Sequence, residues 1–219
     1  MAEEIILDRA GGVATITLDA PDRRNALTRD MARELVGVCD EVDGDPAEPA
    51  AYAGLGDVYR SFQRVGELEP PTIAAVRGGA VGAGVNLAFA TDLRVVSREV
   101  KIVSGFLPIG LHPGGGHGVL LGRTGQREAT AAMALFGEGI DGARAAELGL
   151  AWAAVDDDEV EEAAAGLAAV PGADPELARR TARSVRTELG PPGLPWAAAL
   201  ELERASQMWS MRRKHLAGE

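Results

Sequence analysis

The sequence predicts an α/β protein whose C-terminal part is helical. Short runs of aliphatic residues at 5–8 and 13–18, separated by two glycines, are typical of two adjacent strands. A buried-type strand at 72–76 leads through a glycine-rich turn into an apolar helix. From about residue 126 onward, most of the chain has helical periodicity. Strands and β-β-α elements therefore fill the first two thirds of the chain, and helices fill the rest.

Turn and capping residues place the elements of the first half. Thr28 is a good N-cap for a helix that runs to about Asp43. The apolar residues of this helix share one face: Met31, Leu35, Val38, Cys39 and Val42. A second helix is expected at 57–68, with Tyr59, Phe62 and Val65 on one side, and two prolines end it. After the glycine-rich turn at 78–84 we expect a helix at 85–90 and strands at 93–97 and 100–103.

A second glycine-rich loop, at 105–118, precedes the helical part of the chain. The expected helices span 126–135, 142–148, 159–169, 175–189 and 196–214, and one last strand spans 152–155. Asp141 is the expected N-cap of one helix, and Gly149 is its expected C-terminal glycine. The glycines and prolines that follow residue 189 resemble a hinge. We therefore expect a core at 1–189 and a C-terminal helical extension at 190–219.

Composition restricts the class of protein. With 219 residues, of which 46% are hydrophobic and 25% charged, the chain suits one domain with a sizeable core. The net charge of −11 disfavours nucleic-acid binding, because affinity for a duplex comes mainly from neutralising phosphates. We see no apolar run long enough to span a membrane and no signal-peptide pattern. The single cysteine, Cys39, lies on an apolar helix face and is expected to be a core thiol. These features indicate a cytoplasmic protein that binds neither nucleic acid nor membrane.

The glycine-rich turn at 78–84 is the most informative segment. Gly78, Gly82 and Gly84 follow a buried strand and precede an apolar helix, which places free backbone N–H groups at a positive helix end. Small residues there allow a carbonyl group to approach the backbone, as in an oxyanion hole. A tight, closely packed strand-to-helix turn is the alternative. A phosphate-binding loop is disfavoured, because no Gly-Lys-Ser/Thr follows, and the glycine spacing fits a dinucleotide fingerprint poorly.

Four segments together resemble the enoyl-CoA hydratase/isomerase, or crotonase, superfamily. The signature is a strand ending in IAAV at 73–76, then G-x-A-x-G-x-G at 78–84, an apolar helix, and Asp92 before another strand. ITLDAPDRRNALTRDM at 16–31 resembles the first CoA-binding segment of the family, and GFLPIGLHPGGGH at 105–117 resembles its second active-site loop. GIDGARAAELGLAWAAV at 139–155 resembles the stretch where the family chain re-enters a strand.

The resemblance implies a fold and a ligand. The fold would be a spiral of β-β-α units with a C-terminal helical region, assembled as a homo-trimer or hexamer. The ligand would be an acyl-CoA, with coenzyme A as part of the substrate and no permanently bound cofactor. The backbone N–H of Ala83 would be one of two oxyanion donors. The CoA-binding positions map onto Arg24, Ala26, Gly79, Val81, Gly82, Pro113 and Gly114.

Two departures from the family pattern bear on catalysis. The two catalytic glutamates of the family's hydratases align with Asn86 and Phe106, and the Asp that a related group uses aligns with Gly114. Asn86 cannot take up a proton near neutral pH, and Phe106 can only contact an acyl chain. In addition, the strand and turn that supply the first oxyanion N–H in the family are not visible between residues 43 and 62. We therefore expect the chain around Ala50 and Ala51 to be discontinuous or aberrant.

Two histidines remain as candidate acid/base groups. His112 and His117 flank the glycines of the second loop, and imidazole suits proton transfer near pH 7. A structural or substrate-lining role is the alternative, and no third ligand accompanies them in a metal-binding pattern. The sequence thus favours a protein that acts on or holds a CoA thioester through an oxyanion hole. The alternative is a non-catalytic acyl-CoA carrier or regulatory binding protein.

Overall fold

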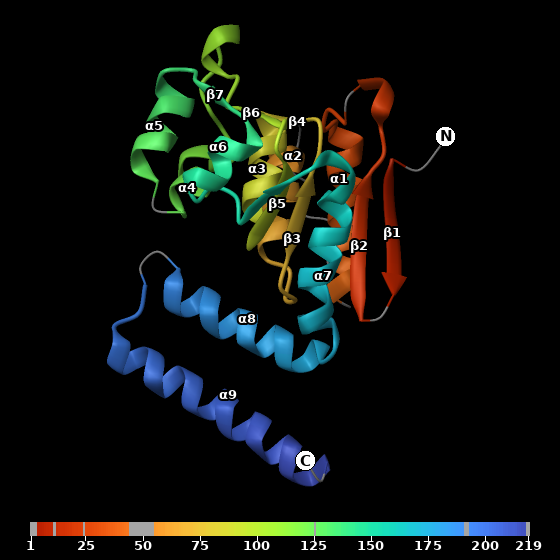
Figure 1. Cartoon of the computed structure of the whole chain (residues 1–219), viewed down its shortest axis with the longest axis vertical. Coiled ribbons are helices and arrows are strands. Elements are labelled where there is room, and N and C mark those ends of the chain that lie inside the picture. Colours follow the sequence, from red (N-terminus) through yellow and green to blue (C-terminus); the bar gives the residue numbers. More distant parts are fainter. Residues whose placement is uncertain are drawn as a thin grey trace.

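The computed structural model describes residues 4–10, 12–23, 25–43, 55–124, 126–190 and 193–217. It confirms the α/β class and the helical C-terminal region. Figure 1 shows a body of strands and covering helices, with two long helices below it. No helix in the described part of the chain is long and apolar enough to cross a membrane.

The described strands form three small sheets. β1 (Ile5–Ala10) and β2 (Val13–Leu18) make an antiparallel pair. β3 (Ile73–Val76), β5 (Leu93–Ser97) and β8 (Ala153–Val155) form a parallel sheet with β5 in the middle. In the third sheet β6 (Lys101–Val103) pairs parallel with β4 (Gly79–Val81) and antiparallel with β7 (Gly139–Ile140). Consecutive strands β3 and β4, and again β5 and β6, lie in different sheets, so the chain spirals between the sheet of β3 and β5 and the sheet of β4 and β6, as the family resemblance implies.

Except for α4, which was not expected, the helices agree with the expected periodicities to within a few residues. They are α1 (Arg29–Asp43), α2 (Leu55–Gly66), α3 (Ala83–Ala90), α4 (His117–Gly122), α5 (Arg127–Leu135), α6 (Gly142–Glu147), α7 (Val160–Gly172), α8 (Pro175–Leu189) and α9 (Trp196–Ala217). Short 3-10 turns are η1 (Pro21–Arg23), η2 (Leu107–Ile109) and η3 (Asp157–Glu159).

The capping residues act as the sequence predicts. Thr28 Oγ1 accepts a hydrogen bond from the backbone N–H of Met31 at 3.2 Å. Asp141 Oδ1 accepts one from the backbone N–H of Arg144 at 2.7 Å. Both satisfy N–H groups that the first helical turn leaves without a partner. Gly149 has a φ of 68°, the left-handed conformation expected of the glycine that ends a helix.

Three local expectations were wrong. The segment 78–84 is not all turn, because Gly79–Val81 pairs with β6 as strand β4 and the helix already begins at Ala83. The loop at 105–118 contains η2, and His117 is the first residue of α4. β7 was not expected, because its two residues carry no periodicity; pairing with β6 alone makes them a strand.

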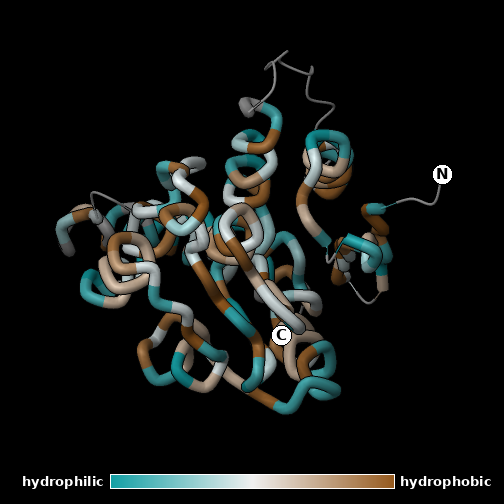
Figure 2. Tube along the Cα trace, turned by 90° about the horizontal axis from the view of Figure 1, so that it is seen from above, coloured by the Kyte–Doolittle hydropathy of each residue, from teal (hydrophilic) through white to brown (hydrophobic). Residues whose placement is uncertain are grey.

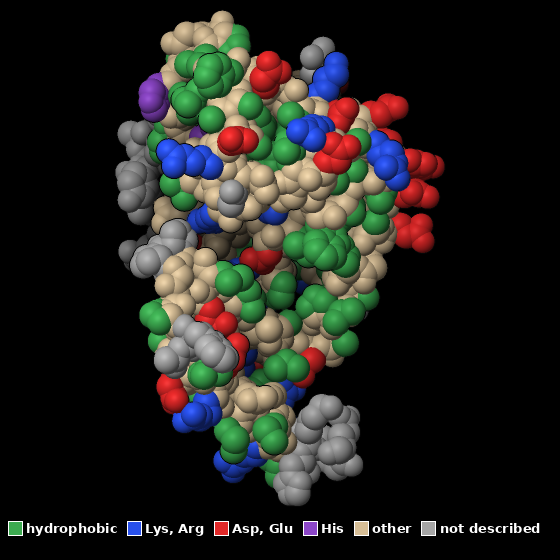
Figure 3. Space-filling view, turned by 60° about the vertical axis from the view of Figure 1, so that its left-hand side comes forward, with side chains coloured by type: hydrophobic (Ala, Val, Ile, Leu, Met, Phe, Trp, Pro, Cys, Tyr) green, Lys and Arg blue, Asp and Glu red, His purple; other side chains and the backbone are tan. Residues whose placement is uncertain are grey.

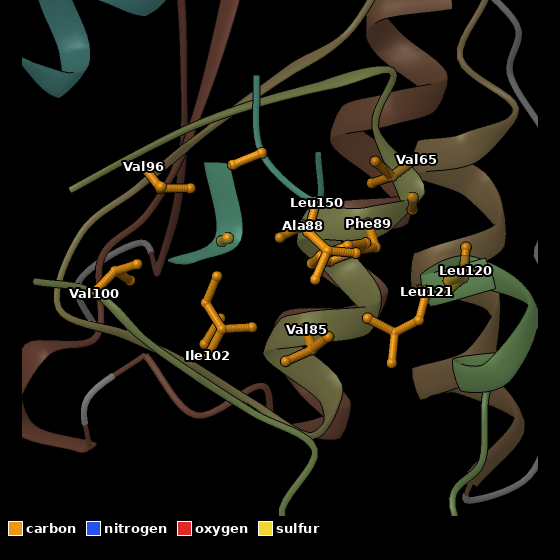
Figure 4. Packing of buried hydrophobic residues seen from close by; sticks show 14 of the residues in the cluster. Val65, Val85, Ala88, Phe89, Val96, Val100, Ile102, Leu120, Leu121 and Leu150 are labelled. Atoms are coloured by element: carbon orange, nitrogen blue, oxygen red, sulfur yellow. The ribbon is translucent and has the colours of Figure 1, made fainter. Parts of the chain in front are cut away.

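The apolar helix α3 lies at the centre of the core. Figure 4 shows Val85, Ala88 and Phe89 of this helix among side chains from strands β5 and β6 and from neighbouring helices. Those neighbours include Val65 of α2, Val96 of β5, Ile102 of β6 and Leu121 of α4, all buried. Burying one large aliphatic or aromatic side chain stabilises a fold by about 1.5–3 kcal/mol. The core therefore holds the N-terminal end of α3 in a fixed place.

Helices α1 and α2 are amphipathic. In α1, Met31, Leu35 and Cys39 are fully buried, while Val38 and Val42 pack against the same core, as the sequence predicts. Figure 2 shows hydrophobic and hydrophilic residues alternating along the helices. In α2, Phe62 and Val65 are buried, but Tyr59 is 38% exposed. Tyr59 therefore does not belong to the core face that its spacing suggested.

Helices α8 and α9 form the lower part of the molecule in Figure 1. Arg186 of α8 ties this part to the body, because its guanidinium donates to the backbone carbonyls of Leu68 and Pro70 and pairs with Asp92. The guanidinium groups of Arg180, in α8, and Arg213, in α9, both lie over the Trp209 ring of α9. The proposed boundary between a core at 1–189 and an extension at 190–219 thus falls between two helices that contact each other.

The expectation of a discontinuous or aberrant chain around Ala50 and Ala51 falls on residues 44–54, outside the described part. Within the described part, β2 and β3 do not pair with each other, and β1–β2 stands as a sheet of its own.

Candidate functional site

The N-terminal end of α3 is the centre of the candidate site. Gly82 precedes the helix with φ 53° and ψ −107°, a backbone conformation that favours glycine, and no side chain caps this end of the helix. The first N–H groups of a helix lack partners within the helix and lie at its positive end. Ala83, the first helical residue, is half-buried. This end of α3 thus presents backbone donors as an oxyanion-binding site requires.

Asn86 lies one turn further along α3 and is 1% exposed. Its side-chain N–H group, on Nδ2, donates to the backbone carbonyl of Gly114 at 2.9 Å. Its carbonyl oxygen Oδ1 lies 2.7 Å from Nδ1 of His117, which is 2% exposed. Nε2 of the same histidine lies 2.8 Å from Oγ of Ser104. A buried chain of hydrogen bonds therefore joins the two glycine-rich segments.

The positions of the protons along this chain follow from the partners. Because the amide nitrogen of Asn86 donates to Gly114, its Oδ1 faces His117, and an amide oxygen can only accept. His117 therefore carries its proton on Nδ1, and in a neutral imidazole Nε2 is an acceptor. The Ser104 hydroxyl must then donate to Nε2. Burial lowers the pKa of His117, which favours this neutral form near pH 7.

The rings of Phe106 and Phe62 lie on two sides of this chain of hydrogen bonds. The Phe106 ring contacts the His117 ring edge-on, with centroids 5.1 Å apart. A Cβ built on Gly82 would lie 3.5 Å from Cζ of Phe106, so this ring also lies over the start of α3. On the other side, a Cβ on Gly115 would lie 2.8 Å from both Asn86 Nδ2 and Phe62 Cε2. The site therefore depends on glycines that let the loop backbone approach closely.

Not every candidate residue joins this cluster. The structure brings together Ala83, Asn86, Phe106, Gly114 and His117, which come from α3, the second loop and α4. His112 is exposed, and its Nδ1 lies 2.7 Å from the backbone carbonyl of Pro113. The two histidines therefore differ, because only His117 is hydrogen-bonded into the buried network of the described residues.

Only some of the candidate CoA-binding residues lie near the N-terminal end of α3. Gly79 and Val81 are exposed residues of β4, and Gly82 directly follows them. Pro113 and Gly114 are half-buried residues of the second loop. Ala26 is exposed in the turn after η1, where its carbonyl accepts from Arg23 Nε at 3.3 Å. Arg24 lies outside the described residues.

Ser104 was missed by the sequence analysis. It follows the last residue of β6 and precedes a glycine with a φ of 72°, which is a common environment for a serine and carries no chemical signal by itself. Its partner His117 is 13 positions away, so only the fold brings the two side chains together.

Other features of the described part offer less chemistry. No group of three or more His, Cys, Asp and Glu side chains among the described residues could hold a metal ion. A hollow of about 350 Å³ lies between the end of α2 and α8, and Figure 3 shows the molecule hollowed between its body and its lower helices. The charged side chains that line it include Glu69, Arg183 and Arg186, which form ion pairs.

Comparisons with known proteins identify the family of this chain. Residues 46–203 match the family model described as enoyl-CoA hydratase/isomerase. A probable enoyl-CoA hydratase of Mycobacterium tuberculosis is 34% identical over 228 aligned positions, which cover 92% of this chain and 86% of the relative. The 1,2-epoxyphenylacetyl-CoA isomerase of Escherichia coli is 30% identical, covering 77% of this chain and 76% of the relative.

A solved structure resembles the whole chain. A putative enoyl-CoA hydratase from Thermobifida fusca, determined in complex with CoA, superposes with a TM-score of 0.80 and 28% identity. The match covers 99% of this chain and 95% of that one. Since the family model spans most of the sequence and a relative is 34% identical over 92% of it, the chain belongs to the enoyl-CoA hydratase/isomerase family.

Proposed function

We propose that this protein binds an acyl-CoA thioester, with the thioester carbonyl oxygen at the N-terminal end of α3, and that it does not hydrate enoyl-CoA. The observation that carries the proposal is the uncapped helix end at Gly82 and Ala83 beside the buried side chain of Asn86. CoA is then part of the substrate, and no permanently bound cofactor is needed.

The binding half of the proposal rests on the helix end. A thioester carbonyl oxygen gains negative charge when a nucleophile attacks it or when an enolate forms, and backbone N–H groups at a helix N-terminus stabilise that charge. Gly82 has no side chain to block this approach. The CoA complex of the Thermobifida fusca relative supports CoA as the ligand.

The other half of the proposal rests on the residues that replace the family's glutamates. Hydration needs a base that activates water and an acid that protonates the α-carbon, each contributing roughly 10²–10⁴-fold. Asn86 cannot ionise, and both ends of its amide are already bonded, to Gly114 and to His117. Phe106 offers only its ring to the site. The described hydrogen-bond chain around Asn86 contains no carboxylate.

The test separates binding from hydration. Butyryl-CoA, a saturated thioester, is titrated into the protein by calorimetry, and crotonyl-CoA is incubated with it while the products are separated by chromatography. We expect butyryl-CoA to bind and 3-hydroxybutyryl-CoA to be absent. The products must be identified, because hydrolysis of crotonyl-CoA would also remove the enoyl-thioester absorbance.

A pair of glycine variants locates the binding site. Gly82→Ala adds a Cβ at a positive φ beside Phe106 and should weaken butyryl-CoA binding at least about 10-fold, since a shift of the helix start misplaces its N–H groups. Gly37→Ala, in α1, meets no atom within 4 Å and serves as the matched control. Formation of 3-hydroxybutyryl-CoA, or equal binding by both variants, would contradict the proposal.

The alternative function is a carrier or regulatory protein that holds acyl-CoA without chemistry. It is favoured by the same replacements, Asn86 and Phe106, and it predicts that every thioester offered is recovered unchanged. Assembly as a homo-trimer or hexamer and a cytoplasmic location stay predictions.

A further inference from the structure

We propose that Ser104, His117 and Asn86 form a nucleophilic triad that hydrolyses the bound acyl-CoA to a carboxylic acid and free CoA. This inference rests on the proposed binding of a CoA thioester at α3. The proposed reaction transfers the acyl group to a serine, instead of adding water to a double bond as a hydratase does.

The order of hydrogen bonds is the one that nucleophilic catalysis requires. The Ser104 hydroxyl donates to Nε2 of His117 at 2.8 Å, and Nδ1–H of His117 donates to Oδ1 of Asn86 at 2.7 Å. A serine is activated by an adjacent imidazole whose other nitrogen is held by a third group, and that group is an asparagine in some triads. The Gly114 carbonyl fixes the amide of Asn86 and with it the histidine tautomer.

The register of β4 and β6 puts the serine beside the oxyanion site. Val81 pairs with Val103 in this parallel ladder, and the next residue, Gly82, donates its backbone N–H to the carbonyl of Val103 at 3.0 Å. Ser104 therefore follows the ladder on β6 where Gly82 and Ala83 follow it on β4. A Cβ on Gly82 would lie 3.6 Å from the carbonyl oxygen of Ser104. The nucleophile and the oxyanion donor thus follow the ends of two paired strands, Ser104 directly after β6 and Ala83 two residues after β4.

The first half of the reaction forms an acyl-serine. Oγ of Ser104 attacks the thioester carbonyl carbon while its proton passes to Nε2 of His117. The negative charge on the carbonyl oxygen is stabilised by the backbone N–H of Ala83. When the carbonyl re-forms, the carbon–sulfur bond breaks and the CoA sulfur takes the proton from Nε2.

The second half uses water. A water molecule gives a proton to Nε2 and attacks the acyl-serine carbon, the ester bond to Oγ breaks, and Oγ takes the proton back. The carboxylic acid leaves and then ionises in solution. Serine and histidine return to their starting forms, so the cycle consumes one thioester and one water.

Phe106 controls entry to this triad. Ser104 is 2% exposed, and the Phe106 ring lies against both Gly82 and His117. The acyl group must displace this ring to reach Oγ. Phe106 lies three residues beyond the end of β6 and directly follows Gly105, which has a positive φ, so the ring is carried by a loop rather than by the sheet.

The experiment measures free CoA and covalent acylation with butyryl-CoA as the probe. Free CoA is quantified by chromatography, and intact-protein mass spectrometry detects a butyryl adduct. Wild-type protein should release CoA in many turnovers and carry an adduct that Ser104→Ala lacks. Ser104→Ala should lower the release of CoA at least about 100-fold, because the nucleophile is lost. The matched control is Ser61→Ala, since Ser61 is also buried but donates only to the carbonyl of Val58 among the bonds described.

A second variant keeps the test valid if Ser104→Ala does not fold. Ser104→Cys preserves the size of the side chain and should give a thioester adduct that hydroxylamine removes. Butyryl-CoA binding, measured by calorimetry, separates the two proposals. Binding without release of CoA above the uncatalysed rate, or release that Ser104→Ala leaves unchanged, overturns the triad and leaves the binding proposal intact. Absence of binding in the wild-type protein overturns the proposed function itself.

Discussion

Asn86 Oδ1 lies 2.7 Å from His117 Nδ1, although the two residues are 31 positions apart and belong to different helices. The contact forms because α3 and α4 pack against each other in the core and both begin at glycine-rich segments. Asn86, with which a family glutamate is expected to align, is in the fold the partner that sets the tautomer of His117.

The loop backbone approaches Asn86 closely at Gly115, so alanine substitutions at Gly115 and Gly116 should differ in their effect on stability. Gly115 and Gly116 both have a positive φ, 67° and 78°, so an alanine at either site is strained. Only at Gly115 would the new Cβ collide, with Asn86 and Phe62; at Gly116 it meets nothing within 4 Å. Gly115→Ala should lower the free energy of unfolding by about 1–3 kcal/mol more than Gly116→Ala, as overpacking does. Urea unfolding measures this difference, and equal losses would show that Asn86 and Phe62 move aside freely.

Burial of neutral His117 predicts a loss of stability at mildly acidic pH. Its pKa is lowered in the folded state, so the unfolded chain binds the proton more tightly. The stabilising contribution is present above the unfolded pKa of about 6.5 and is lost as the pH falls toward the folded pKa. The free energy of unfolding of the wild type should therefore fall between pH 7.5 and about pH 5.5.

The control for this pH dependence is His117→Gln, which keeps a polar side chain that does not titrate. The pKa of Glu188 is raised, mainly by burial, and this group contributes an opposite trend as the pH rises above about 4.5. It contributes equally to both proteins, so the difference between wild type and variant isolates the histidine. Parallel pH profiles for the two proteins would exclude a protonation change at His117 on unfolding.

The exposed apolar side chains of α9 predict self-association. Met208 and Met211 are 61% and 60% exposed, and Leu200 is also exposed. An apolar helix surface of this kind is usually covered in an assembly. Light scattering should give the mass of a trimer or hexamer, and the double substitution Met208→Glu with Met211→Glu should lower it. Gln207→Glu, an exposed neighbour, is the control for added charge; a wild-type monomer would refute the prediction.

Local rules were sufficient for most of the secondary structure. Thr28, Asp141 and Gly149 mark helix ends through hydrogen bonds and backbone angles that depend on a few adjacent residues. The strand at 72–76 and its glycine-rich turn carried the resemblance to the family, which the comparisons confirm. The failures, at β4, β7 and α4, are short segments whose state is decided by a partner strand or helix far along the chain.

The sequence by itself determined the α/β class and the family, because these depend on local patterns and on motif residues in a fixed order. Only the tertiary structure decided that Asn86, His117 and Ser104 form one hydrogen-bonded chain while His112 stays exposed. The physical reason is that hydrogen bonds act over about 3 Å, and the residues that meet at that distance are fixed by how the sheets and helices pack, which no local pattern records.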